Sequence, residues 1–299
     1  RLSETEKDSL RPDTVITLGG AIVSRHIKDW LRNIPKLSHW HIGISHTTID
    51  CFKHLTMRIN MDAAPFLSQL ASAMSRQKGV SAYSQLWHDA SMRASEFHDS
   101  YIEKAPWSDI KAMAHIFSNI PRSWNVHLSN GTPVRYAQLM DNMNIHRSEC
   151  NRGVSGIDGC TSTALGSSAV FKGVTLLISG DMSFQYDISA LSSEILSPRF
   201  KMIVICNGGG GIFRFIKATS EFPETEKYLA VGTNLPLSDL CKGYGISYFE
   251  ADSCESLSHS FSQFVSESER PALLAIHTPP KLSADVLKGY FTGILPEQK

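Results

Sequence analysis

The stretch VTLLISGDMSFQYDISALSSEILSPRFKMIVICN, residues 174–207, decides the fold. It holds two continuous apolar runs, at 174–179 and 202–206, and a helix is expected between them at 188–196. Strands without polar alternation that are separated by helices are typical of a parallel sheet covered on both faces. We therefore expect an α/β fold in which these two runs are neighbouring strands.

Both apolar runs end in side chains that can bind a cation. Asp181 closes the first run and Asn207 closes the second. Neighbouring strands lie roughly 4.8 Å apart, so oxygens about 2.1 Å from one ion can bridge them. Carboxylate and amide oxygens suit Mg²⁺, and Ser183 could donate to a phosphate near a helix start. The alternative from spacing alone is a strand-end turn at Gly180 and Asp181 with a helix cap.

Four consecutive glycines, 208–211, follow Asn207. Each one costs conformational entropy, and backbone groups reach a ligand closely only where no Cβ intervenes. The run therefore predicts a bare loop laid against a ligand. It does not spell the GxGxxG dinucleotide fingerprint, and the chain has neither a GKS/GKT loop nor a GxSxG elbow.

The rest of the chain continues the alternation of strands and helices. Further strands are expected at 14–18, 40–44, 124–128, 247–250 and 272–277, and helices up to residue 31 and at 63–74, 160–171, 237–244 and 256–266. Residues 84–117 are mostly helical in pattern, with a break at 105–106. We place a domain boundary near the polar segment 77–81.

Composition excludes several classes of protein. The 299 residues include 29 basic and 29 acidic side chains, so nothing favours nucleic acid or an anionic membrane as partner. No apolar run reaches the roughly 18 residues of a membrane-spanning helix. Six cysteines without a CxxC pair are interpreted as reduced thiols of a cytoplasmic protein. Because the chain begins with Arg1, we interpret it as a fragment or a processed product.

Two motifs carry a family resemblance. GDMSF at 180–184, followed by CNGGGGIF at 206–213, resembles the thiamine-diphosphate motif, with Met182, Cys206 and Gly208 departing from its common form. NRGVSGIDG at 151–159 is the more specific match. Together they resemble the menaquinone-pathway 2-succinyl-5-enolpyruvyl-6-hydroxy-3-cyclohexene-1-carboxylate (SEPHCHC) synthases, over residues 11–277. The resemblance implies a partial transhydrogenase-type α/β domain at 1–80, a diphosphate-binding domain at 81–299, and no pyrimidine-binding domain.

The resemblance also assigns roles to individual residues. Metal ligands would be Asp181, Asn207 and the carbonyl of Gly209. Cofactor contacts would come from Asn130, Gly131, Gly180, Ser183 and Asn207, with Ile157 as an apolar prop. Substrate contacts would come from Arg135, Arg152, Phe213, Ile216, Arg25 and His26. Each has a simpler alternative: surface ion pairs for Arg135 and Arg152, core packing for Ile157, a solvated helix position for His26, and a turn for Asn130.

The implied activity depends on thiamine diphosphate and Mg²⁺ or Mn²⁺. It decarboxylates 2-oxoglutarate and joins the product to isochorismate, in a cytoplasmic homodimer or homotetramer. Two other functions stay open at this point. One is another thiamine-diphosphate enzyme, similar to acetolactate synthase, and the other is a non-catalytic cofactor-binding module.

In this superfamily a glutamate of the pyrimidine-binding domain activates the cofactor, and no segment of this chain resembles that domain. We therefore expect little or no decarboxylation of 2-oxoglutarate by this polypeptide alone. The measurement is a thiamine-diphosphate-dependent decarboxylation assay, and turnover comparable to that of a full-length synthase would contradict the expectation.

Overall fold

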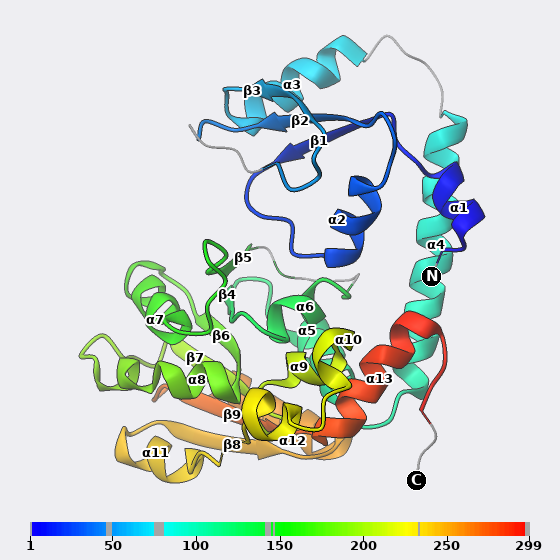
Figure 1. Ribbon diagram of the computed structural model, residues 1–299. Helices are drawn as coiled ribbons and strands as arrows, with labels where there is room; N and C mark the ends of the chain where they lie inside the picture. Colours follow the sequence, from blue (N-terminus) through cyan, green and yellow to red (C-terminus); the bar gives the residue numbers. More distant parts are fainter. Residues whose placement is uncertain are drawn as a thin grey trace. The chain divides into compact units, whose positions relative to one another are not determined.

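A computed structural model describes residues 2–45, 50–74, 81–140, 145, 147–232 and 234–296. The chain forms two compact units, Arg1–Phe97 and His98–Lys299, and the division falls within helix α4 (Ala82–Lys104) (Figure 1). Of the segment 77–81, where we expected a boundary, only residue 81 is described. Each unit contains a parallel sheet with helices, so the predicted α/β class is confirmed.

The first unit has a three-stranded parallel sheet in the order β1-β2-β3. Its elements are α1 (Glu4–Ser9), β1 (Thr14–Leu18), α2 (Arg25–Arg32), β2 (Ser38–Ile42), β3 (Leu55–Ile59) and α3 (Ala63–Met74). The expected segments 14–18 and 63–74 match β1 and α3, and the strand expected at 40–44 starts two residues earlier. Strand β3 was not predicted, because its sequence LTMRI is short and mixes apolar with polar residues.

The second unit is built on a six-stranded parallel sheet in the order β5-β4-β6-β7-β9-β8 (Figure 1). Its strands are β4 (Asn125–Leu128), β5 (Arg147–Cys150), β6 (Thr175–Gly180), β7 (Phe200–Cys206), β8 (Ser247–Ala251) and β9 (Ala272–His277). Strands β6 and β7 are direct neighbours, with Gly180 paired to Ile205, as the opening stretch predicted. Only β5 escaped prediction, since RSEC carries no apolar run.

Helical segments precede, connect and follow these strands. They are α5 (Asp109–Asn119), α6 (Pro133–Ala137), α7 (Cys160–Val170), α8 (Asp181–Tyr186), η1 (Ile188–Ser192), α9 (Gly211–Phe215), α10 (Lys217–Ser220), η2 (Thr225–Ala230), α11 (Leu237–Gly243), α12 (Cys254–Ser266) and α13 (Pro280–Thr292). The helix expected at 188–196 is wrong: helix α8 starts directly at the end of β6, and only a short 3₁₀ turn, η1, follows it.

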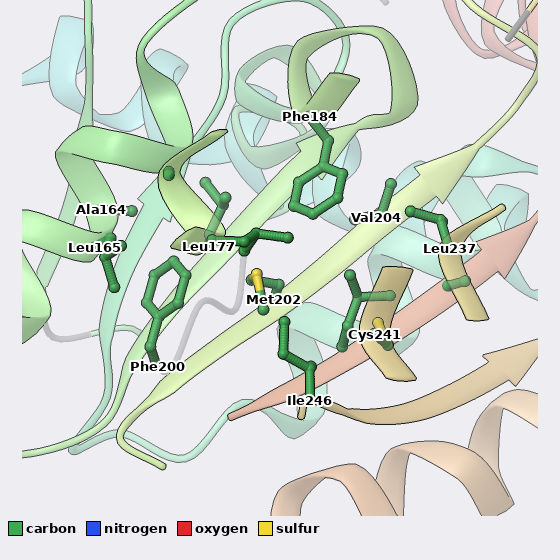
Figure 2. Close-up of a cluster of buried hydrophobic side chains, with 14 residues drawn as sticks. Ala164, Leu165, Leu177, Phe184, Phe200, Met202, Val204, Leu237, Cys241 and Ile246 are labelled. Atoms are coloured by element: carbon green, nitrogen blue, oxygen red, sulfur yellow. The ribbon is translucent and has the colours of Figure 1, made fainter. Parts of the chain in front are cut away.

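Side chains of β7 alternate between the two faces of the sheet. Phe200, Met202 and Val204 enter an apolar cluster with Phe184, Leu237 and other side chains from α7, α8, η1 and α11 (Figure 2). Because side chains point to opposite faces in turn, the intervening residues face the other side, where α12 packs. The sheet is therefore covered on both faces, as its apolar strands require.

Lys201 lies inside β7, although the predicted strand began only at Met202. Only 2% of its side chain is exposed, and its Nζ donates to the carbonyls of Phe264 (2.5 Å), Val265 (3.4 Å) and Glu267 (2.6 Å). The ammonium also lies over the rings of Trp124 and Phe264. Burial lowers the pKa of Lys201 to about 8. The side chain thus satisfies carbonyls at the C-terminal end of α12.

All six cysteines are free. Across the part of the chain that the structure describes, no helix combines the length and apolar character that a membrane span requires.

Replacing Lys201 with Met should lower the free energy of unfolding by about 1–3 kcal/mol, because it leaves buried carbonyls of α12 without a donor. Denaturant-induced unfolding of this chain measures the change. The matched control is Lys172→Met at an exposed position, which should stay within about 0.5 kcal/mol of wild type. Equal stability of the Lys201 variant would show that the capping interaction contributes nothing.

Candidate functional site

The order of the strands selects one edge of the second unit's sheet as a ligand site. From β4 the chain goes outward to β5 and then returns to β6 on the opposite side of β4, so the direction reverses between β4 and β6. Ligands of open parallel sheets bind at such a switch point, beside the carboxyl ends of the strands. Asn130 follows β4 there and Asp181 follows β6, while Ser129 Oγ accepts the N–H of Gly180 (3.3 Å) and ties the two strand ends together.

Asp181 joins the end of β6 to the glycine loop that follows β7. Its side chain is only 4% exposed. One carboxylate oxygen accepts the N–H of Met182 (2.7 Å), and the other accepts the N–H of Gly209 (2.9 Å). The structure therefore brings the first predicted metal ligand against the loop that carries the other two.

The glycines allow this loop to pack against other backbone. Gly209 has a φ of +90°, and a Cβ there would overlap the carbonyl oxygens of Ala230 and Val231. The N–H of Gly210 donates to the carbonyl of Ala230 (2.6 Å). The close backbone approach expected from the sequence is present, but its partner is the C-terminal end of η2. Contact of the same loop with a diphosphate stays a prediction.

Arg214 holds the glycine loop through its side chain, and the sequence did not lead us to predict this residue. Its side chain is 7% exposed and donates to both carboxylate oxygens of Glu226 (3.0–3.2 Å). It also donates to the carbonyls of Asn207 (3.1 Å) and Gly208 (2.9 Å). The hydrogen bonds and charge of Arg214 lower the pKa of Glu226. An arginine inside the apolar sequence GIFRF was the available signal, because a charge in such a run needs a partner.

Two predicted apolar contacts flank Arg214. Phe213 is half-buried, and its ring lies under Gly210, where a Cβ would meet it at 2.8 Å. Ile216 caps the C-terminus of α9 and is also half-buried. Both residues lie beside the glycine loop, and their contact with a substrate stays a prediction.

Asn130 holds the NRGVSGIDG loop at the edge of the sheet. Its Nδ2 donates to the carbonyls of Asn151 (2.7 Å) and Gly156 (2.6 Å), and its Oδ1 accepts from Arg152 (2.6 Å). Only 2% of the residue is exposed. These bonds occupy the amide within the protein, so the side chain shapes the loop here.

Ser183 fastens the same loop to helix α8. Its Oγ donates to the carbonyl of Ile157 (2.5 Å), and Ser183 itself is 3% exposed. Ile157 is half-buried at the turn of the loop. The predicted diphosphate contact at Ser183 and the predicted prop at Ile157 are therefore adjacent in space.

Arg135 and Arg152 form a pair of like charges. Burial lowers the pKa of Arg135, and the charge of Arg152 lowers it further. Arg135 donates to the carbonyl of Gly131, whose φ of +95° forms the turn before α6. The Nε of Arg152 is buried and finds no partner among the described residues. Within the same described ranges neither arginine is in an ion pair with an acidic side chain, so the alternative of surface ion pairs is not observed.

The other two predicted substrate residues belong to the first unit. Arg25 begins helix α2, is exposed, and pairs with Asp29 (3.3 Å). His26 follows it and is also exposed. Both residues belong to the unit Arg1–Phe97, and their part in substrate binding stays a prediction.

Asp109 is a buried carboxylate that sequence reasoning did not single out. It is 2% exposed and accepts from Asn207 Nδ2 (2.7 Å) and from Thr278 Oγ1 (2.5 Å). Burial raises the pKa of Asp109, and the negative charge of Asp181 raises it further. The sequence offered no signal beyond an acidic residue at a helix start, because its partners lie far along the chain.

The predicted metal ligands form an oxygen set of mixed type. No group of three or more His, Cys, Asp or Glu side chains suited to a metal exists in residues 2–296 as far as they are described. The predicted set has one carboxylate, one amide and one carbonyl. Since Nδ2 of Asn207 is engaged by Asp109, its Oδ1 is the atom left for a cation. Hard oxygen donors of this kind fit Mg²⁺ or Mn²⁺.

No family model matches the chain. Individual proteins do: a 2-succinyl-5-enolpyruvyl-6-hydroxy-3-cyclohexene-1-carboxylate synthase of Porphyromonas gingivalis is 37% identical over 300 residues, which cover 98% of this chain and 52% of that protein. The synthase of the same name from Christiangramia forsetii is 37% identical over 94% of this chain and 48% of its own length. That from Bacteroides thetaiotaomicron is 28% identical, covering 97% and 51%.

The similarity runs through both compact units, because it covers nearly all of the chain. The chain spans about half the length of the curated relatives it matches. Over its own length, the chain is thus a homologue of the SEPHCHC synthases.

Proposed function

We propose that this chain provides the diphosphate, metal and carboxylate contacts of a thiamine-diphosphate-dependent SEPHCHC synthase. The reaction is the decarboxylation of 2-oxoglutarate and carboligation to isochorismate in menaquinone biosynthesis. The observation that carries the proposal is the arginine pair, Arg135 and Arg152, beside the switch point and without an acidic partner among the described residues. The similarity to SEPHCHC synthases supports the same reaction.

The unit His98–Lys299 would be the diphosphate-binding domain. Its sheet places Asp181, Asn207 and the Gly209 backbone at one edge, where they would hold Mg²⁺ or Mn²⁺ together with the diphosphate. Gly180, Ser183 and Gly131 would line the diphosphate. The unit Arg1–Phe97 would be part of a transhydrogenase-type domain.

The arginines account for substrate choice in this proposal. A guanidinium pairs bidentately with a carboxylate, and 2-oxoglutarate and isochorismate each carry two carboxylates. Two guanidinium groups held close together repel, so an anion between them is stabilised by both. Phe213 and Ile216 would form the apolar wall that excludes water. When bound, thiamine diphosphate supplies the electron sink that decarboxylation requires.

Replacing Asp181 with Ala should abolish binding of thiamine diphosphate with Mg²⁺, because the carboxylate is the one charged metal ligand in the set. Isothermal titration calorimetry of this chain measures the affinity. Asp239→Ala, at an exposed position on α11, is the matched control and should bind as wild type does. Thermal unfolding without ligand separates loss of the site from loss of the fold, and unchanged affinity in Asp181→Ala would refute the metal assignment.

Replacing Arg152 with Gln should weaken binding of 2-oxoglutarate to the cofactor-loaded chain about 10- to 100-fold, the size expected for one charged hydrogen-bonded pair. Binding of pyruvate should weaken less, because pyruvate has a single carboxylate. Arg147→Gln is the matched control, since Arg147 is exposed and pairs with Glu149. Pyruvate bound more tightly than 2-oxoglutarate by the unsubstituted chain would favour an enzyme similar to acetolactate synthase.

A further inference from the structure

Asp109 connects four separate segments of the second unit. It is the first residue of α5, and its backbone N–H donates to Ser283 Oγ (3.0 Å). One carboxylate oxygen accepts from Thr278 Oγ1 (2.5 Å), just beyond β9. The other accepts from Asn207 Nδ2 (2.7 Å), just beyond β7, and from the Tyr136 hydroxyl (3.5 Å) on α6. The carboxylate therefore lies directly behind the predicted metal ligand Asn207.

The contact decides which way the Asn207 amide faces. An amide has one donor atom and one acceptor atom, and a carboxylate oxygen accepts. If the Asn207 amide were turned over, its Oδ1 would meet Asp109 Oδ2 at the distance now taken by the hydrogen bond, 2.7 Å. Two acceptors at that distance repel, so Asp109 selects the orientation in which Oδ1 points away from it.

Asn207 is buried and its backbone is also held in place. Its backbone carbonyl accepts from Arg214 (3.1 Å). Gly211 lies beside the amide as well, where a Cβ would come within 2.9 Å of Asn207 Nδ2, so the absence of a side chain there leaves room for the amide. The residue is 4% exposed. The amide is therefore buried, its Nδ2 is held by Asp109, and the orientation set by Asp109 is the one the site presents.

We infer that Asp109 is a positioning residue for the metal site, which holds Asn207 Oδ1 ready to bind the cation beside Asp181. The inference rests on the proposed function, because it takes Asn207 as a metal ligand. Asp109 would not touch the metal itself. Hydrogen-bond partners behind a ligand typically change metal affinity 10- to 100-fold when they are replaced.

The test is the affinity of this chain for Mn²⁺ in the presence of thiamine diphosphate, measured by electron paramagnetic resonance of free Mn²⁺. Asp109→Asn keeps the size of the side chain but can face Asn207 with either amide atom, so it no longer enforces one orientation. Its affinity should fall about 10- to 100-fold. Thr278→Val removes a different hydrogen bond of Asp109 and leaves the contact with Asn207, so its affinity should stay at the wild-type value.

An exchange of the two side chains gives the sharper result. Asn207→Asp alone places two carboxylates against each other and should bind Mn²⁺ weakly. In the double variant Asp109→Asn, Asn207→Asp, the amide at 109 donates to one oxygen of the carboxylate at 207, and the second oxygen remains for the metal. The double variant should therefore recover most of the affinity that each single variant loses.

Thermal unfolding in metal-free buffer measures how much Asp109 contributes to the stability of the fold itself. If Asp109→Asn folds and binds Mn²⁺ as wild type does, the positioning role is overturned while the metal site stands. If Asp109→Asn does not fold, the double variant decides, and its failure to bind Mn²⁺ overturns the inference. Unchanged affinity in Asp181→Ala, or no Mn²⁺ binding by the unsubstituted chain, overturns the proposed metal site itself.

Discussion

The parallel register of β6 and β7 is the constraint on which the candidate site depends. Gly180 pairs with Ile205, so both strands end at the same edge, and Asp181 and Asn207 emerge there together. A slip of one residue would send every side chain of β7 to the opposite face. Lys201 would then enter the apolar cluster and lose its carbonyl partners on α12. Packing far from the site therefore determines its geometry.

The glycine loop shows how a segment without side chains is held in place. Its N–H groups donate to the carboxylate of Asp181 and to the carbonyl of Ala230, and its carbonyls accept from Arg214. The ion pair between Arg214 and Glu226 joins a buried guanidinium to a half-exposed carboxylate through charge-assisted hydrogen bonds. The absence of Cβ atoms lets η2 approach the loop. The same bare backbone is what a diphosphate would require.

Polar groups of the site differ in how fully the protein satisfies them. The amide of Asn130 and the carboxylate of Asp109 are hydrogen-bonded to other groups of the protein through both of their polar atoms. Arg152 keeps a buried Nε without a partner among the described residues, next to a second guanidinium. Buried polar groups are normally hydrogen-bonded, and a ligand carboxylate could supply the missing partner in the proposed function. In the proposed function, the satisfied residues would build the site and Arg152 would contact the substrate.

Local patterns in the sequence were sufficient for most strands of both sheets and for the residues at their carboxyl ends. Apolar runs identified β6, β7 and β9, and motifs identified Asp181, Asn207 and the NRGVSGIDG loop, because these signals lie within a few neighbouring residues. Strand β5, Lys201 and the contact between Asp109 and Asn207 were decided only by the tertiary structure. Asp109 and Asn207 lie 98 residues apart. A polar side chain far along the chain leaves no periodic or local signature of its partner, since its hydrogen bond exists only after the strands have paired and the helices have packed.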